Sequence, residues 1–441
     1  MIKKILLFSV AISQLTISCS NDEPTTPIAE QSLSEQIAEI IKQPYSKLTP
    51  AQQKVKLEAE ANEMLVQMDK SKSSGAIEAL QNLARLLDVS SVDVFSGKND
   101  NSVEDIINTA GVYGIYTWNA SKNTWTKTTS STELKFIFPA KASLTANNAV
   151  FSTKGTASDV KVKIQDSYNW QTDTEVNDYI FLPTTADAVL TIDNVSAATF
   201  TQTAKYANGK EVPNEFAYKM TLNDGYTWEM SGTKATENTS KAAFTFNGKN
   251  LVSFNAGSSA SIDKLIEDDN LTQYKGKANG LVQIMDNFVI VANMDLATEA
   301  ADEMALEKSL PIVDYQKKTY LTDLNAYQLK YAEGSVTNFN KNIKLTLVSK
   351  KDGTKIAEVV KRSEKGYSYK YMYDLWIVDN SNTYGGYWDY NPNGGTIIQY
   401  YDEELYLKFN DNTEVSMSTY FSEGFENLET KFEDFIKAFD K

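Results

Sequence analysis

The sequence predicts an α+β fold dominated by an antiparallel β meander, in the form of a curved sheet or half-barrel. Three patterns support this prediction. Apolar residues recur at helical spacing between residues 32 and 105, alternating runs broken by Asn-Gly and Asp-Gly follow, and phenylalanines at helical spacing end the chain. We therefore expect N-terminal helices, a central meander and a C-terminal amphipathic helix packed on the sheet.

Residues 1–18 have the order of an export signal. Lys3 and Lys4 supply positive charge, and residues 5–12 supply an apolar run. This run is too short to span a bilayer, which takes about 20 helical residues. Cys19, the only cysteine in the chain, follows directly. We expect Cys19 to carry diacylglycerol in thioether linkage, with palmitate as an acyl group. The alternative is an ordinary secretory signal peptide in which the cysteine is incidental.

The segment Leu15-Thr16-Ile17-Ser18-Cys19 resembles the lipobox of bacterial lipoproteins. It departs from the strictest form, because Leu15 lies four residues before the cysteine where three is usual. The resemblance implies that a lipid on Cys19 anchors the mature protein to a membrane.

Residues 19–31 form a polar, proline-containing stretch with an acidic pair, Asp22 and Glu23. Sequence of this kind stays extended and solvated, so we expect a tether. The acidic pair just after the cysteine resembles the surface-export signals of Bacteroidota lipoproteins. That resemblance implies an outer-membrane protein displayed on the cell surface.

Residues 32–105 have helical patterns with start signals. Ser32 and Glu35 have the spacing of a capping box, and Thr49-Pro50-Ala51-Gln52 is a second start. A third helix is expected after Gly75. All three have apolar faces, which favours packing over a stalk.

Residues 110–295 alternate as β-strands do. Val112–Trp118 and Thr124–Thr128 predict a hairpin, and Leu134–Phe138 predicts a strand that ends at Pro139. Later hairpin turns are expected at sites where Asn, Asp or Gly tolerate positive φ. These are Asn208-Gly209, Asn223-Asp224-Gly225, Asn247-Gly248, Asp286-Asn287 and Asp352-Gly353.

Residues 296–332 predict a helical connection, with one helix from Thr298 to Lys308 and a shorter one near Tyr320. Residues 340–441 predict a tyrosine-rich β region with the C-terminal helix. The helix is indicated by phenylalanines and a leucine three and four residues apart: Phe421, Phe425, Leu428, Phe432, Phe435 and Phe439. A helix that binds a partner is the alternative to one packed on the sheet.

This layout, together with the segment from Leu48 to Lys54, resembles surface-exposed lipoproteins of Bacteroidota. The resemblance implies a location and no activity, so no residue is carried over as catalytic.

Composition excludes several chemistries. The net charge of −15 disfavours nucleic acid and anionic lipid as partners. The chain has no histidine, which removes Ser-His-Asp and Cys-His catalysis and the usual zinc sites. Ser261 and Lys264 have Ser-x-x-Lys spacing, but Ser261 is better explained as a helix N-cap.

Asp389, Asn391 and Asn393, followed by Gly394, match the first part of a calcium-binding loop. Tyr400 occupies the position where such loops place a bidentate glutamate. Two explanations of these residues therefore stay open: a calcium-binding site and an ordinary turn rich in Asn and Gly. We expect no other cofactor.

Aromatic residues are dense between Tyr367 and Tyr406, and Tyr367, Tyr369, Tyr371 and Tyr373 alternate, so we expect them to share one strand face. Cross-strand packing is the alternative to a binding role for these strand residues. Tyr384, Tyr387, Trp388 and Tyr390 lie among glycine and asparagine in a stretch expected to be a loop. Alternation places Trp388 and Tyr387 on opposite faces, so at least one large ring should face water. Such rings are a candidate surface for a ligand.

The sequence thus favours a non-enzymatic envelope lipoprotein whose ectodomain binds a glycan, a lipid or a protein. The alternative is a carboxylate-based glycan hydrolase built on Glu267-Asp268-Asp269 or Asp402-Glu403-Glu404. An exposed aromatic strip would favour a glycan, and a dry, concave apolar face would favour a lipid.

Overall fold

The computed structural model describes residues 32–422, apart from 72, 90–93, 95–102 and 269–271. The expected signal peptide, the tether with Cys19, and the expected C-terminal helix beyond residue 422 lie outside the described residues. Among the helices that are described, none is both long and apolar enough to cross a membrane.

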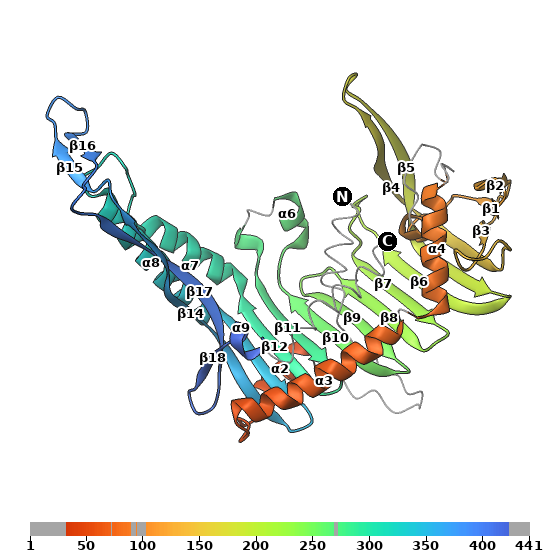
Figure 1. The fold of residues 1–441 in the computed structure, drawn as a ribbon. Helices are drawn as coiled ribbons and strands as arrows, with labels where there is room; N and C mark the ends of the chain where they lie inside the picture. Colours follow the sequence, from red (N-terminus) through yellow and green to blue (C-terminus); the bar gives the residue numbers. More distant parts are fainter. Residues whose placement is uncertain (1–31, 72, 90–93, 95–102, 269–271, 423–441) are drawn as a thin grey trace.

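Most of the structure is one 16-stranded sheet (Figure 1). Its strands along the chain are β1 (Gly114–Asn119), β2 (Thr124–Thr128), β3 (Leu134–Phe138), β4 (Ala149–Asn169), β5 (Thr174–Ile192), β6 (Val195–Lys205), β7 (Glu215–Leu222), β8 (Tyr226–Thr233), β9 (Asn238–Phe246), β10 (Lys249–Ser258), β11 (Lys277–Ile284), β12 (Phe288–Asp295), β13 (Ile343–Ser349), β14 (Thr354–Tyr371), β17 (Thr396–Lys408) and β18 (Glu414–Ser416). A separate pair, β15 (Leu375–Val378) and β16 (Gly386–Asp389), forms a two-stranded sheet.

The order across the large sheet is β18-β17-β14-β13-β12-β11-β10-β9-β8-β7-β6-β5-β4-β3-β1-β2. From β3 to β14, each strand therefore pairs with its neighbour in the chain, and these pairs are antiparallel. The pair β1 and β3 is parallel. The sheet is open, with β18 and β2 at its edges, and it curves through a U-shaped outline in Figure 1. The predicted antiparallel meander is confirmed.

Turn chemistry explains the meander. Asn247 and Gly248 have φ values of 50° and 74°, as a two-residue hairpin turn with the twist of its strands requires. Asn208 and Gly209 also have positive φ, at 58° and 68°. Both turns were expected from the sequence.

The helices are α2 (Leu33–Ile41), α3 (Pro50–Ser71), α4 (Gly75–Val89), α5 (Val103–Ile107), α6 (Ile262–Glu267), α7 (Leu296–Ser309), α8 (Tyr320–Asn342) and α9 (Met417–Tyr420), with a 3-10 turn at Thr272–Tyr274. The start signals are confirmed. Ser32 and Glu35 form the capping box of α2. Before α3, the Gln52 N–H donates to Thr49 Oγ1 (3.3 Å) and the Thr49 N–H donates to Gln52 Oε1 (3.0 Å).

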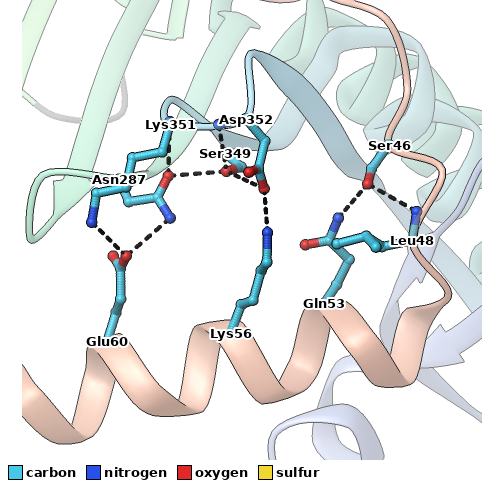
Figure 2. A network of polar contacts seen from close by, with 9 residues as sticks. All are labelled: Ser46, Leu48, Gln53, Lys56, Glu60, Asn287, Ser349, Lys351 and Asp352. Carbon is cyan, nitrogen blue, oxygen red and sulfur yellow. Dashed lines mark hydrogen bonds and ion pairs between the residues drawn. The ribbon is translucent and has the colours of Figure 1, made fainter.

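Helix α3 runs along the row of turns at one end of the strands (Figure 1). Figure 2 shows how it is held there. Glu60 Oε1 accepts from Asn287 Nδ2 (3.0 Å) in the β11–β12 turn and from Lys351 Nζ (2.9 Å) in the β13–β14 turn. Lys56 Nζ contacts Asp352 Oδ2 at 2.8 Å. The helix thus links successive hairpins.

The two faces of the sheet are covered by different helices. On β12, Phe288 is buried in a cluster with Leu57 of α3, whereas its neighbour Val289 is buried in a cluster with Ile37 of α2. Successive strand residues point to opposite faces, so α3 and α2 lie on opposite faces. The largest cluster lies on the α3 side and includes Met64 of α3, much of α4 and the aromatic residues of β1, β3 and β4.

Two elements extend away from this core (Figure 1). One is the long β4–β5 hairpin, whose tip residue Trp170 is 87% exposed. The other is the far part of the β14–β17 ribbon, which carries the β15–β16 hairpin and lies beside α8. Its residues 360–405, together with α8, are called the C-terminal arm below.

Two differences from the sequence-based expectations stand out, and a third expectation is met only in part. The stretch with Trp388 was expected to be a loop, but Gly386–Asp389 is a strand paired with Leu375–Val378. The second helix of the 296–332 connection was expected to be short, but α8 spans 23 residues and reaches Asn342. Ser261 is the N-cap residue of α6, as expected, although its side chain makes no capping hydrogen bond.

Candidate functional site in the C-terminal arm

The C-terminal arm is a two-stranded ribbon that outgrows the sheet. β13 pairs with β14 only as far as Val359, and β18 pairs with β17 only from Tyr406. Beyond these points, β14 and β17 continue to pair with each other up to Tyr371 and Thr396. Within the described part of the chain, neither outer edge of the ribbon has a neighbouring strand.

Helix α8 crosses this ribbon and satisfies backbone groups on both edges. Asn340 Nδ2 donates to the carbonyl of Lys361 (2.9 Å), and its Oδ1 accepts from the Lys361 N–H (2.8 Å). On the other strand, Asn325 Nδ2 donates to the Ile397 carbonyl (2.8 Å) and Oδ1 accepts from the Gln399 N–H (3.0 Å). Each asparagine takes the place of a neighbouring strand for one residue pair.

A polar cluster holds the middle of α8 against the ribbon. Lys361 Nζ forms an ion pair with Glu403 and donates to Ser335 Oγ at 3.0 Å. Ser335 Oγ donates to Glu403 Oε2 at 3.2 Å. The Lys361 and Glu403 side chains are only 20% and 24% exposed. Glu403 is therefore committed to an ion pair within the fold.

Tyrosine rings form a continuous row along the ribbon. Tyr367 and Tyr369 stack at 5.9 Å between ring centroids, and Tyr400 of the paired strand lies 6.4 Å from each of them. Tyr369 to Tyr371 is 6.3 Å, Tyr371 to Tyr373 is 6.2 Å and Tyr373 to Tyr390 is 5.7 Å. The expectation that alternation places the β14 tyrosines on one face is confirmed. This set is called the tyrosine row below.

The tyrosine row is open to solvent at several rings. Tyr367 is 69% exposed, and Tyr373 and Tyr390 are about half exposed, at 51% and 50%. Burial raises the pKa of Tyr369 and of Tyr371, with a smaller contribution from neighbouring tyrosines. Both hydroxyls therefore stay protonated at neutral pH, where each can donate and accept a hydrogen bond.

A second aromatic group lies at the β15–β16 hairpin, which is called the tip of the arm below. Trp388 of β16 packs edge-on against Trp376 of β15 at 5.2 Å, and Tyr320 at the start of α8 lies 6.5 Å from it. Trp388 is half-buried, and its indole N–H is buried with no acceptor within the described structure. Tyr384 and Tyr387 are 54% and 47% exposed. The expected water-facing rings are therefore Tyr384 and Tyr387, whereas Trp388 packs against Trp376 and Tyr320.

The three residues of the calcium hypothesis are engaged locally. Asp389 Oδ1 accepts the N–H of Tyr390 (2.8 Å), and Asn391 Nδ2 donates to Asp374 Oδ1 (2.9 Å). Asn393 is exposed. Within the described residues, no group of three or more acidic, histidine or cysteine side chains is placed to hold a metal. Calcium binding at this turn stays a prediction.

The acidic run at Asp402 is split between partners. Glu403 pairs with Lys361, as described above, while Glu404 accepts a hydrogen bond from Ser418. Asp402 lies opposite Glu364 on the ribbon. Because adjacent strand residues point to opposite faces, Glu403 does not lie on the same face as its neighbours.

Sequence reasoning found the tyrosine row and the tip tyrosines, but it missed three contributors. Tyr315 and Tyr320 join the tip, stacked edge-on at 5.2 Å. Asp374 organises the base of the tip through Asn391, Gly395 and Thr396. The density of tyrosine near Tyr320 was visible in the sequence, whereas these long-range contacts had no local signal.

The chain has no match among protein-family models, curated proteins or solved structures. The function must therefore be argued from the site itself.

Proposed function

We propose that the protein is an exported, lipid-anchored surface protein that binds a glycan through the tyrosine row and the tip tyrosines of the C-terminal arm. The observation that carries the proposal is the row of partly exposed rings from Tyr400 to Tyr390, with centroid spacings of 5.7 to 6.4 Å. A row of this kind offers flat apolar faces and hydroxyl groups to successive units of an extended polymer.

The support beneath the row fits a binding role. Because α8 fixes both edges of the ribbon, the rings are held on a preformed surface, which lowers the entropy cost of binding. Trp376 and Trp388 pack against each other across the β15–β16 pair, which restricts the motion of the tip. The ion pair of Lys361 with Glu403 lies between α8 and the ribbon. It holds the helix in position and does not contact the ligand.

The acidic residues of the arm do not support the alternative function, a glycan hydrolase. Such chemistry needs two carboxyl groups facing each other across a cleft. Glu403 is paired with Lys361, and Glu404 is hydrogen-bonded to Ser418. The acidic run therefore has structural partners.

The proposal is tested by substituting Tyr367 and Tyr373 together with alanine. Glycan arrays identify ligands of the full chain, and calorimetry then compares variants on the best ligand. We expect the double variant to bind at least about tenfold more weakly, since loss of an aromatic contact in a binding centre costs more than about 1 kcal/mol. Stability should change by less than about 1 kcal/mol, as for other exposed side chains.

Trp170→Ala provides the matched control, because Trp170 is the most exposed aromatic residue among the described residues of the β4–β5 hairpin. It should leave glycan binding unchanged. Unchanged binding by the Tyr367 and Tyr373 variant, or an equal loss with Trp170→Ala, would rule out the tyrosine row as the binding surface.

A further inference from the structure

A pocket of about 490 Å³ lies where α3 ends and α4 begins, far along the sheet from the C-terminal arm. It is bounded by this helix junction and by residues at the turns β5–β6, β7–β8 and β9–β10. Its volume lies within the range of about 300–1,000 Å³ typical of small-molecule sites. The pocket is separate from the proposed glycan surface.

Serines donate to three of the carbonyl groups at the end of α3. Ser71 Oγ donates to the Met68 carbonyl (2.6 Å), and Ser73 Oγ donates to the Lys70 carbonyl (2.8 Å). The Ser74 N–H donates to the Ser71 carbonyl at 3.0 Å. The negative end of α3 is therefore capped by its own serines.

The start of α4 offers the opposite chemistry. Ser74 accepts the first hydrogen bond of this 15-residue helix, from the Glu78 N–H at 3.0 Å. The N–H groups of a helix's first turn have no partner within the helix, and they favour an anion. Ser74 lines the pocket, is only 3% exposed, and its Oγ has no hydrogen-bond partner among the described residues.

Charge and apolar surface complete the pocket. Lys70 lines it, with Nζ lying 6.0 Å from the centre of the Phe246 ring. The Phe246 ring packs in a tilted orientation against the buried Tyr226, with 4.6 Å between ring centroids, and Tyr226 donates its hydroxyl proton to the Gln67 carbonyl at 2.5 Å. Asp224 also lines the pocket and supplies a negative charge.

We propose that this pocket binds a small molecule in which an oxyanion, either a carboxylate or a phosphate, is joined to an apolar group. The oxyanion lies at the start of α4, where Ser74 Oγ donates to it and Lys70 neutralises its charge. The apolar group lies against Phe246 and Tyr226. Asp224 opposes the anion and limits its affinity.

Calorimetry on the full chain tests this proposal with three probes: phenyl phosphate, 3-phenylpropionate and the neutral benzyl alcohol. At least one anion should bind, and benzyl alcohol should bind about tenfold more weakly or not at all. Binding of phenyl phosphate alone identifies a phosphate site, and binding of 3-phenylpropionate alone identifies a carboxylate site. Equal binding of benzyl alcohol, or no binding of either anion, would overturn the proposal.

Two variants with opposite expected signs sharpen the test. Lys70→Met should weaken anion binding about tenfold, in line with the loss of one charged hydrogen bond. Asp224→Asn should strengthen it several-fold. Lys205→Met, which removes an exposed lysine at the far end of β6, is the matched control and should change nothing. Unchanged binding by Lys70→Met, or weaker binding by Asp224→Asn, contradicts an oxyanion in this pocket.

Discussion

Asp374 shows how a single carboxylate organises the tip of the C-terminal arm. Its oxygens accept from Asn391 Nδ2 (2.9 Å), the Gly395 N–H (3.1 Å) and Thr396 Oγ1 (2.9 Å). Burial alone would raise the pKa of Asp374, but the hydrogen bonds from these three residues hold it below its usual value. The carboxylate thus joins the start of the β15–β16 segment to its end.

This pKa shift predicts that the tip loosens in acid. Because the folded-state pKa is depressed, the stabilisation is complete above the unfolded value of 3.8 and is lost as pH falls through the folded value. The amide resonance of Gly395, followed by NMR, should therefore shift with a midpoint below 3.8. Asp374→Asn should abolish that titration. A midpoint above the unfolded value would mean that the hydrogen bonds do not favour the charged form.

The sequence predicts the strand face on which a residue lies, but not whether its ring is buried. Alternation alone placed the β14 tyrosines on one face and separated Trp388 from Tyr387, and both inferences are confirmed. Which ring packs and which is exposed was not predictable. Trp388 is half-buried because Trp376 and Tyr320 happen to meet it, and those contacts depend on tertiary structure.

At the scale of elements, α8 replaces the missing neighbours of a ribbon. An unpaired strand edge invites pairing with another chain, and proteins commonly cover such edges. Here the covering is done by two asparagine side chains, Asn325 and Asn340, spaced along one helix. The arm can therefore extend as two strands without a third.

Asn340→Ala should destabilise the arm, because it removes the acceptor of the Lys361 N–H and one of the two donors to the Lys361 carbonyl, the other being Arg362 Nη1. We expect a loss of about 1–2 kcal/mol in the free energy of unfolding, the usual effect of unsatisfied, partly buried groups. Chemical denaturation of the full chain measures it. Thr322→Ala, an exposed position on the same helix, is the control and should cost nothing. Equal stability of the two variants would show that water replaces the asparagine fully.

The length of α8 explains one failure of the sequence-based prediction. The helical connection was expected to end at residue 332, shortly before Gly334. In the structure, a Cβ at Gly334 would lie 2.3 Å from the Leu306 side chain of α7, so glycine permits close packing of the two helices. The helix then continues to Asn342. A glycine that ends a helix and one that allows a helix crossing look alike in a single sequence.

At the scale of the whole molecule, the sheet is unusually wide for an open one. Open sheets rarely exceed about ten strands without curling or splitting. This sheet has 16 strands and curves, and α3 ties its turns together along one end through Glu60 and Lys56.

Start signals and turns predicted the helices and the meander well, because they are local. The role of α3 was not predictable, since its partners lie 227 to 296 positions away in the chain.

The curved sheet also places its two functional candidates apart. The tyrosine row lies on the C-terminal arm, and the pocket lies at the α3–α4 junction. Figure 1 shows this arm and this junction in different parts of the curved sheet. If the protein binds a polymer at the tyrosine row and a small molecule in the pocket, a segment outside both proposed sites has to attach it to the membrane. Cys19 is the proposed means of attachment.

Cys19→Ser tests that attachment. The only thiol in the chain is lost, so acyl labelling should disappear, and the protein should leave the membrane fraction for the soluble one. The physical reason is that none of the described helices is apolar and long enough to hold the protein in a bilayer by itself. Its net charge of −15 also opposes attraction to anionic lipid. Ser20→Ala, a neighbouring change that keeps the thiol, should retain both labelling and attachment. If the Cys19→Ser protein still sediments with membranes after a high-salt wash, another part of the chain holds it there and the proposed anchor is wrong.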